Sequence, residues 1–284
     1  MGGSGRGRDC GHRPVTVIVV PVYNAPEELE RCLAGLERTV GSTRRVALID
    51  DASTDPRVPK LLEGVAGHWE VFTNPFNQGF VATANRGMDL AGSSDVVLLN
   101  SDTIPAGSWL EAMESCAASD PSIASATPFT NNGEIASIPR FCHNNPLPED
   151  PEQWARACWE AGTPSYPEIP TAVGFCMYMR RACIDEIGKF DVGRFGRGYG
   201  EENDWSMRAI KAGWRNVLCD NAYVAHSGGA SFGPLGLGPG DEAMERLLQL
   251  HPDYMDRVSR FIEKDPLAKS RARVLKRLDA MKES

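Results

Sequence analysis

Residues 15–24 read VTVIVVPVYN, and this stretch decides the fold class of the chain. Residues 15–20 are all β-branched and do not alternate between apolar and polar, which predicts a strand covered on both faces, as in a parallel sheet. A helix start follows, with Asn24 as its N-cap, Pro26 in its first turn and two glutamates near its positive end. The stretch therefore predicts the strand-then-helix unit of an α/β protein.

The same rhythm of strand and helix continues along the chain. Residues 46–49 (VALI), 69–72 (WEVF) and 95–99 (DVVLL) are predicted to form further strands. Residues 111–170 show a weaker pattern and are expected to be irregular, and residues 172–179 are predicted to form a later strand. We therefore expect an α/β fold, Rossmann-like, with a mainly parallel central sheet flanked by helices.

Polar side chains fall where the predicted strands end. Residues 23–24 (YN), 50–51 (DD) and 101–102 (SD) each follow directly after an apolar strand. Because the carboxyl ends of parallel strands share one edge of a sheet, and ligands bind in the crevice there, we expect these three segments to converge on one site.

Composition excludes several classes of protein. The 284 residues carry a formal net charge of −8, so no overall positive field attracts nucleic acid, and we expect no nucleic-acid partner. No apolar run reaches the roughly 20 residues that span a bilayer. The eight cysteines form no Cys-x-x-Cys pair, which predicts free thiols in a reducing, cytoplasmic compartment rather than a structural zinc site. Residues 1–13 are Gly/Arg-rich and are expected to be a flexible leader.

Six short motifs follow one another along the chain. They are residues 19–24 (VVPVYN), residues 48–55 (LIDDASTD), Asn77 and Gly79 with Asn85 and Gly87, residues 99–103 (LNSDT), residues 200–205 (GEENDW), and His226. Taken together and in this order, they resemble the motifs of glycosyltransferase family 2. The resemblance implies a GT-A fold over residues 14–235, with a nucleotide-sugar-binding half (14–105) and an acceptor and catalytic half (106–235). Residues 236–284 are expected to form a C-terminal helical tail.

A divalent metal site is the first implication of the resemblance. Breaking the bond between a sugar and a nucleotide leaves a charged diphosphate, which Mn²⁺ or Mg²⁺ neutralises as a Lewis acid. The family has an Asp-x-Asp motif here, but this chain carries Asn100 in place of the first acid. Asp102 is then the sole carboxylate ligand of its loop, and His226 is expected to complete the protein ligands. The alternative for Asp102 is a helix cap.

A nucleotide site at the strand ends is the second implication. The resemblance places the base near Pro21, Tyr23 and Asp51, where Tyr23 stacks on the ring and Asp51 accepts a bond from an imide N–H. Such a bond favours uracil or thymine, hence a UDP- or dTDP-sugar, and Asp50 is expected at the ribose. The two aspartates could instead cap a helix, and Asn77 with Gly79 could form a plain turn. The full expected nucleotide-sugar set is Pro21, Tyr23, Asn24, Asp50, Asp51, Asn77, Gly79, Ser101 and Asp102.

A catalytic base is the third implication. By position Glu202 matches the carboxylate that removes the proton of the acceptor hydroxyl, with Glu201 as the alternative and Asp204 as an orienting group. Acidic residues also favour any helix N-terminus, which is the other explanation of this cluster. Trp205 is expected to pack on a sugar or to lie in the core, and Gly174 is placed in the acceptor site.

The function that follows is an inverting transfer of a sugar from a UDP- or dTDP-sugar to a hydroxyl of a glycan or glycolipid, in bacterial surface polysaccharide or glycoconjugate synthesis. Asn100 in the metal motif leaves open a non-catalytic sugar-nucleotide-binding or scaffold module. Residues 50–54 (DDAST) resemble an aspartyl-phosphatase loop with a misplaced second acid, which keeps a phosphotransferase as a weaker alternative.

The tail beyond residue 241 combines basic and apolar residues on either side of Pro266. Two amphipathic helices of this kind predict peripheral contact with the inner face of the plasma membrane. The alternative is that they pack on the core or on a second subunit, as in a homodimer.

Overall fold

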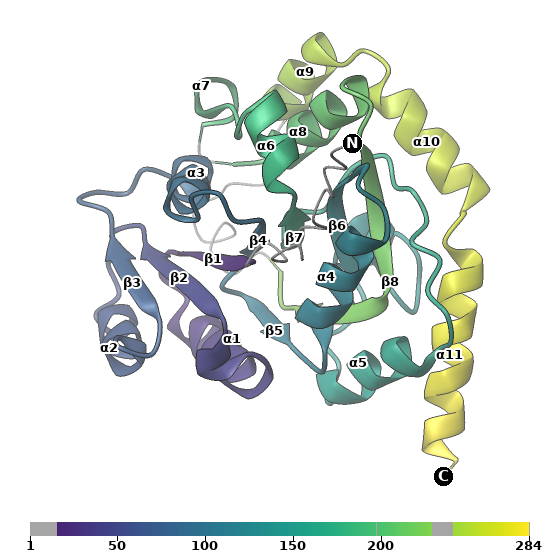
Figure 1. Ribbon diagram of the computed structural model, residues 1–284, viewed down its shortest axis with the longest axis horizontal. Helices are drawn as coiled ribbons and strands as arrows, with labels where there is room; N and C mark the ends of the chain where they lie inside the picture. The colour runs from purple at the N-terminus through teal and green to yellow at the C-terminus, as the bar shows by residue number, and fades with distance from the viewer. Residues whose placement is uncertain (1–15, 197, 229–240, 284) are drawn as a thin grey trace, which may run out of the picture.

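The computed structural model describes residues 16–196, 198–228 and 241–283. Within these ranges eight strands form one sheet, in the order β3-β2-β1-β4-β7-β6-β8-β5 (Figure 1). The strands are β1 (Val17–Val22), β2 (Arg45–Asp50), β3 (Glu70–Thr73), β4 (Val96–Leu99), β5 (Thr103–Pro105), β6 (Ile123–Phe129), β7 (Cys176–Met179) and β8 (Arg215–His226).

The helices cover both faces of this sheet. Figure 1 shows α3 on one face of the first strands and α1 and α2 on the other. The α-helices are α1 (Pro26–Thr39), α2 (Arg57–Val65), α3 (Phe80–Leu90), α4 (Trp109–Ser119), α5 (Pro151–Glu160), α6 (Arg181–Ile187), α7 (Val192–Phe195), α8 (Glu201–Lys211), α9 (Asp241–Leu250), α10 (Tyr254–Lys264) and α11 (Ala268–Lys282), with 3₁₀ turns η1 (Gly41–Thr43) and η2 (Glu134–Ala136).

The first half of the sheet is parallel. Strands β3, β2, β1 and β4 are all paired in parallel, and all six residues of β1 are buried. Ile18 and Val20 belong to the core cluster on the α1 and α2 side, whereas Val17 and Val19 belong to the cluster on the α3 side. The unbroken apolar run of β1 is thus explained by two covered faces, as expected. Val15, the first residue of that run, lies outside the described residues.

The second half of the sheet is mixed. Strand β7 runs antiparallel to both β4 and β6, β8 runs parallel to β6, and β5 closes the edge antiparallel to β8. The predicted α/β class with a mainly parallel sheet is confirmed. The expected irregularity of residues 111–170 was wrong, because this region contains most of α4, all of β6 and α5.

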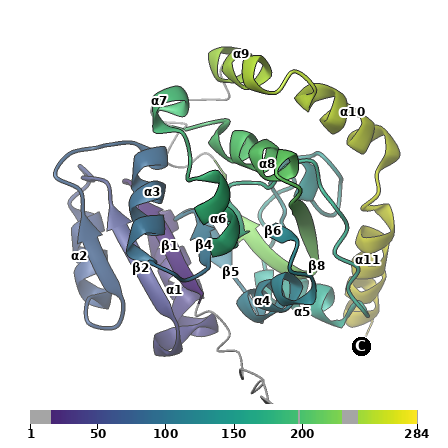
Figure 2. The ribbon, with the colours of Figure 1, turned by 45° about the horizontal axis from the view of Figure 1, so that its top comes forward.

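Helices α9, α10 and α11 form an arc along one side of the molecule (Figure 2). The apolar residues Val274 and Leu278 of α11 are buried in a core cluster that includes Ala157 of α5. Asp220, whose side chain has no exposed surface, accepts bonds from Ser270 and from Arg273 of α11. The apolar face of α11 is therefore used inside the fold, as the core-packing alternative had it.

No helix in the described part of the chain is long and apolar enough to cross a bilayer. Exposed large apolar side chains remain on α10, where Met255 and Ile262 are 43% and 41% exposed. The expected membrane contact is thus reduced to α10 and stays a prediction.

Candidate functional site

The loops after β1 and β2 are bonded to each other. Asn24 donates its backbone N–H to Ser53 Oγ at 2.9 Å, and its side-chain Oδ1 accepts the N–H groups of Thr54 and Asp55 at 2.9 and 3.0 Å. The expected N-cap role of Asn24 was wrong: α1 is preceded by Ala25, in a left-handed conformation, as N-cap. Asn24 instead holds two strand ends in a fixed relation.

Asp51 is the centre of a second set of bonds. It is 3% exposed, and its carboxylate accepts Asn74 Nδ2 at 2.6 Å, the Gln78 N–H at 2.9 Å and the Gly79 N–H at 2.8 Å. Gly79 has a φ of 86°, a region that favours glycine, and α3 begins directly after it. Asp51 therefore shapes the loop between β3 and α3. Its contact with a base stays a prediction, and Asn74 is a partner that the sequence analysis missed.

The remaining residues of the expected nucleotide site surround these loops. Pro21 lies within β1, opposite Ile49 in the register, and Tyr23 follows with a half-buried side chain. Asp50 is 4% exposed and accepts the Ser53 N–H at 2.9 Å, and Asn77 is half-buried in the β3–α3 loop. The two aspartates do not cap the next helix, since the N-cap of α2 is Pro56.

The loop after β4 carries the expected metal ligand. Ser101 and Asp102 are 5% and 7% exposed. Asn100 donates its N–H to the Phe175 carbonyl at 2.8 Å, while its buried Oδ1 has no hydrogen-bond partner among the described residues. The helix-cap alternative for Asp102 was wrong, because the next helix, α4, has Ser108 as its N-cap.

His226 lies directly against Asp102. Its Nε2 is 3.3 Å from Asp102 Oδ1, and its Nδ1 is 2.6 Å from the Asn132 carbonyl oxygen. Nδ1 must donate to that carbonyl, which turns Nε2 toward the carboxylate. Phe175 stacks on the ring with centroids 5.2 Å apart, and Asn131 exchanges bonds with the His226 backbone. Burial lowers the pKa of His226, but the Asp102 carboxylate outweighs it and raises the pKa overall.

These two side chains fit a divalent cation held partly by its substrate. A carboxylate and an imidazole are both ligands of Mn²⁺, and Mg²⁺ is commonly held by one or two carboxylates together with phosphate oxygens. The described residues contain no group of three or more His, Cys, Asp or Glu side chains arranged to hold a metal. The buried, unpartnered Oδ1 of Asn100 in the same loop is a further oxygen with spare binding capacity.

Two adjacent carboxylates begin helix α8. Glu201 is 4% exposed, Glu202 is half-buried, and one buried oxygen of each has no hydrogen-bond partner among the described residues. Burial, and then the charge of Glu202, raise the pKa of Glu201 well above its usual range. Burial also raises the pKa of Glu202, to about 7. Of the two, Glu202 is the one that can exchange a proton near neutral pH.

Two other residues of this helix turn away from the carboxylates. Asp204 is 4% exposed and bonds to Arg208 Nε and His251 Nε2, both at 2.8 Å, so the orienting role expected of it in catalysis is not supported. Trp205 has no exposed surface and donates to the Gly188 carbonyl at 3.0 Å. Its expected contact with a sugar was therefore wrong, and the core alternative holds.

A cavity of about 290 Å³ opens beside Glu202. Gly174 lies beside Glu202, since an added Cβ there would be 3.6 Å from the Glu202 carboxyl carbon. Burial, and then the charges of Glu201, Glu202 and Asp102, raise the pKa of Tyr199, which lines the same cavity. The lining residues are Glu134, Ala172, Val173, Tyr199, Gly200, Glu202, Asn203, Ala243, Met244, Leu247 and Tyr254.

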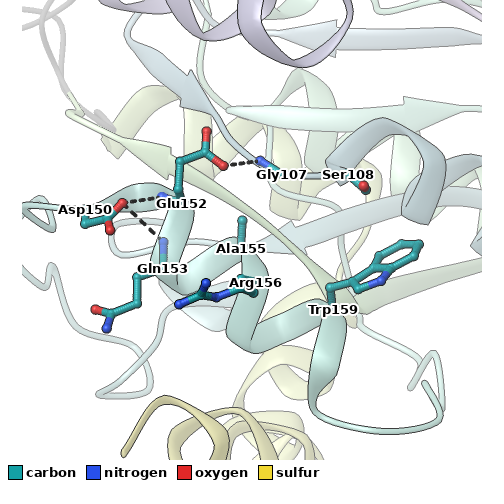
Figure 3. Close-up of a pocket in the computed structure, with 8 residues that line it drawn as sticks. All are labelled: Gly107, Ser108, Asp150, Glu152, Gln153, Ala155, Arg156 and Trp159. Atoms are coloured by element: carbon teal, nitrogen blue, oxygen red, sulfur yellow. Dashed lines mark hydrogen bonds between the residues drawn. The ribbon is translucent and has the colours of Figure 1, made fainter. Parts of the chain in front are cut away.

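A second hollow, of about 400 Å³, lies between α5 and the start of α4 (Figure 3). Its carboxylates are engaged by the protein itself: Glu152 accepts the Gly107 N–H at 2.8 Å and Arg38 Nε at 2.7 Å, and Asp150 caps α5. Figure 3 shows Trp159 on the opposite side of this hollow from Asp150. The hollow offers no unpartnered acid or base, so the cavity at Glu202 is the better candidate for chemistry.

Comparisons with known proteins agree with this geometry. The family model described as Glycosyl transferase family 2 matches residues 17–188. An uncharacterized protein of Mycobacterium tuberculosis (strain ATCC 25618 / H37Rv) is 27% identical over 217 residues, covering 75% of this chain and 74% of its own.

Two solved structures share the fold at low identity. The structure of GalNAc-T7 with UDP, GalNAc and Mn²⁺ has a TM-score of 0.63 at 15% identity. The match covers 93% of this chain and 54% of the GalNAc-T7 chain. The mannosyltransferase PcManGT from Pyrobaculum calidifontis, in complex with GDP-Man and Mn²⁺, has a TM-score of 0.54 at 13% identity, covering 96% of this chain and 76% of its own. The expected GT-A fold is confirmed.

Proposed function

The chain belongs to glycosyl transferase family 2 and is a glycosyltransferase, and from that premise we propose an inverting transfer from a UDP- or dTDP-sugar to a hydroxyl of a glycan or glycolipid. The observation that carries the proposal is Glu202, a carboxylate whose pKa is raised to about 7 and that has one unpartnered oxygen, at the edge of a cavity. It lies beside Gly174, whose neighbour Phe175 is bonded to Asn100 of the loop after β4. The neighbours bound to UDP or GDP-Man support a nucleotide-sugar donor.

Asp102 and His226 would hold Mn²⁺ or Mg²⁺, and the bound cation would neutralise the charge that develops on the leaving diphosphate. Both solved neighbours carry Mn²⁺, which supports such a metal here. The protein's own contribution is orientation: Asn132 fixes the tautomer of His226 so that Nε2 faces Asp102. The loops tied by Asn24 and Asp51 would hold the nucleotide at the strand ends.

Glu202 would act as the general base. The acceptor oxygen forms a bond to the anomeric carbon, its proton moves to Glu202, and the bond to the diphosphate oxygen breaks with both electrons leaving on the diphosphate. A single displacement of this kind inverts the anomeric centre. Burial, and then the charge of Glu202, raise the pKa of Glu201 well above its usual range, which favours its protonated form and makes it the weaker candidate for the base.

The wider assignment follows the same division of the chain. We assign residues 14–105 to the nucleotide sugar, residues 106–235 to the acceptor and catalysis, and residues 236–284 to a tail whose described part, residues 241–283, is mostly helical. The boundary at 235 lies outside the described residues. Bacterial surface polysaccharide or glycoconjugate synthesis at the inner face of the plasma membrane is the proposed setting, and a homodimer is the proposed assembly. A non-catalytic binding module would have no use for two adjacent glutamates that each keep a buried oxygen without a hydrogen-bond partner, which favours the enzyme.

A donor screen tests this function. Thermal shift is measured with UDP-, dTDP- and GDP-sugars, with and without Mn²⁺, and nucleotide release is followed for each donor that binds. We expect a shift that depends on Mn²⁺, and its loss in Asp102→Asn but not in the control Asp256→Asn, a carboxylate on the exposed face of α10. Binding without release would favour the non-catalytic module, and phosphate release from sugar phosphates would favour a phosphotransferase.

A further inference from the structure

The cavity at Glu202 has one wall that comes from the C-terminal helices. Ala243, Met244 and Leu247 of α9, with Tyr254 of α10, line it although they follow Glu202 by about 40 residues or more. Met244 is 38% exposed, so this wall offers apolar surface to whatever enters, while Leu247 is 1% exposed and belongs to a buried core cluster. A sugar ring has apolar C–H faces that pack on such side chains, since the burial of apolar surface is favourable.

Acidic side chains also line the cavity. Glu134 and Glu202 do so together with the phenol of Tyr199, and none of the described residues that line the cavity is a lysine or an arginine. The charge of Glu134 reaches Glu202, because it contributes to the raised pKa of that carboxyl. A phosphate or carboxylate entering this space would meet two acids and no lining cation, which is an unfavourable arrangement of like charges.

The apolar wall is fixed to the helix that carries the base. His251, at the end of α9, is 3% exposed, and its Nε2 bonds to Asp204 Oδ1 of α8 at 2.8 Å. Lys211, at the end of α8, is 2.8 Å from His251 Nδ1 and donates to the Leu250 carbonyl at 3.1 Å. The position of α9 relative to α8 is therefore fixed by the buried bond between His251 and Asp204 and by the bonds of Lys211.

We propose that the acceptor is an uncharged sugar whose apolar face lies on Met244 and Leu247 while one hydroxyl faces Glu202, and that Glu134 excludes acceptors bearing phosphate or carboxylate. This inference rests on the proposed function and adds the chemical class of the acceptor to it. The cavity of about 290 Å³ is at the small end of ligand pockets and suits one ring with its substituents. The acceptor atom is then a sugar hydroxyl, not a phosphate oxygen of a lipid carrier.

Sugar acceptors with and without a negative charge test whether the cavity excludes anionic acceptors. The full-length protein, with its best donor and Mn²⁺, is given methyl hexosides, the corresponding methyl uronosides and hexose 6-phosphates, and kcat/KM for transfer is measured. We expect the neutral glycosides to be preferred on the order of 100-fold. Glu134→Gln should narrow that preference to about tenfold and lower the apparent pKa of the acid limb of kcat/KM.

The apolar wall is tested separately. Met244→Ala should raise KM for the neutral glycosides about fivefold to tenfold, through lost apolar contact. Met255→Ala is the control, because Met255 is equally exposed but does not line the cavity. Equal or better use of uronosides or phosphates, or no use of any neutral glycoside while the donor is still hydrolysed, would overturn the inference. Absence of donor turnover would instead overturn the proposed function.

Discussion

The polar side chains of the strand-end loops on the donor side are hydrogen-bonded within the protein, whereas several at the catalytic edge are not. The side-chain oxygens of Asn24 and Asp51 accept hydrogen bonds from backbone N–H groups of neighbouring loops. In the described part of the chain, the buried side-chain oxygens without a hydrogen-bond partner all lie in the loop after β4, at the start of α8 or directly after β8: Asn100 Oδ1, Glu201 Oε2, Glu202 Oε2 and Ser227 Oγ. A buried polar atom without a hydrogen-bond partner costs free energy of folding. We therefore infer that these four atoms mark where a ligand binds, and that the hydrogen-bonded loops around Asn24 and Asp51 set the position of that ligand.

The largest expected effect is on kcat, at Glu202, one of the residues with an unpartnered buried oxygen. Glu202→Gln keeps the size of the side chain but removes the base, so kcat for transfer should fall on the order of 10²- to 10⁴-fold. Glu201→Gln should cost far less, because burial raises the pKa of Glu201 well above its usual range and so favours the protonated form, which is not a base. Initial rates at saturating donor measure both variants, and donor binding should be unchanged in each. A larger loss in Glu201→Gln would reverse our assignment of the base.

The next effect is on stability, at Asp51, whose carboxylate is hydrogen-bonded within the protein. Asp51→Ala leaves Asn74 and the N–H groups of Gln78 and Gly79 without their acceptor, and should lower the free energy of unfolding by about 3 kcal/mol or more. Urea unfolding of the variant and the wild type measures the difference. In contrast, Glu202→Gln should leave stability at pH 7 unchanged or raise it, because it removes a poorly satisfied buried charge. If both variants lost the same free energy of unfolding, the proposed difference between the donor-side loops and the catalytic edge would be wrong.

The smallest effect is a pH dependence of stability. Glu202 faces Glu201, Glu134, Tyr199 and Tyr254, and its pKa is raised from 4.5 to about 7. The folded state therefore binds a proton more tightly than the unfolded state, so this contribution is fully present below pH 4.5 and is lost as pH rises through about 7.

The measurement is the melting temperature of the wild type minus that of Glu202→Gln, followed from pH 4.5 to pH 8. The difference should fall with rising pH, by the equivalent of about 2–3 kcal/mol at most. In the same range kcat/KM of the wild type should rise, since the base must lose its proton to act. A difference that is flat with pH would show that the pKa of Glu202 is not raised.

The parallel half of the fold was predictable because β1, β2 and β4 are covered on both faces and read as short apolar runs. Residues 46–49 and 95–99 fall within one residue of β2 and β4. The missed β6 reads IASATPF, with small residues and a proline, and it is a strand because β7 and β8 flank it. Such dependence on distant neighbours is not visible in local sequence.

The site shows the same limit at the level of single side chains. The sequence brought Glu202, Asp204 and Trp205 together as one motif, but successive helical residues are turned by about 100°. Asp204, two residues after Glu202, therefore lies on the opposite side of the helix and bonds to His251. Trp205 is buried in the core and bonds to Gly188, which local sequence does not reveal. Asn131 and Asn132 position His226 although they precede it by about 95 residues, so this contact is not visible in local sequence either.

The late position of α9 in the chain has a consequence for synthesis. Domains fold from the N-terminus as the chain leaves the ribosome. The donor loops, the metal ligands and Glu202 all emerge before Met244 and Leu247, which complete the cavity. A nascent chain thus contains the residues proposed to activate the donor before it contains the residues proposed to select the acceptor. Selectivity for the acceptor would therefore be completed after the donor site.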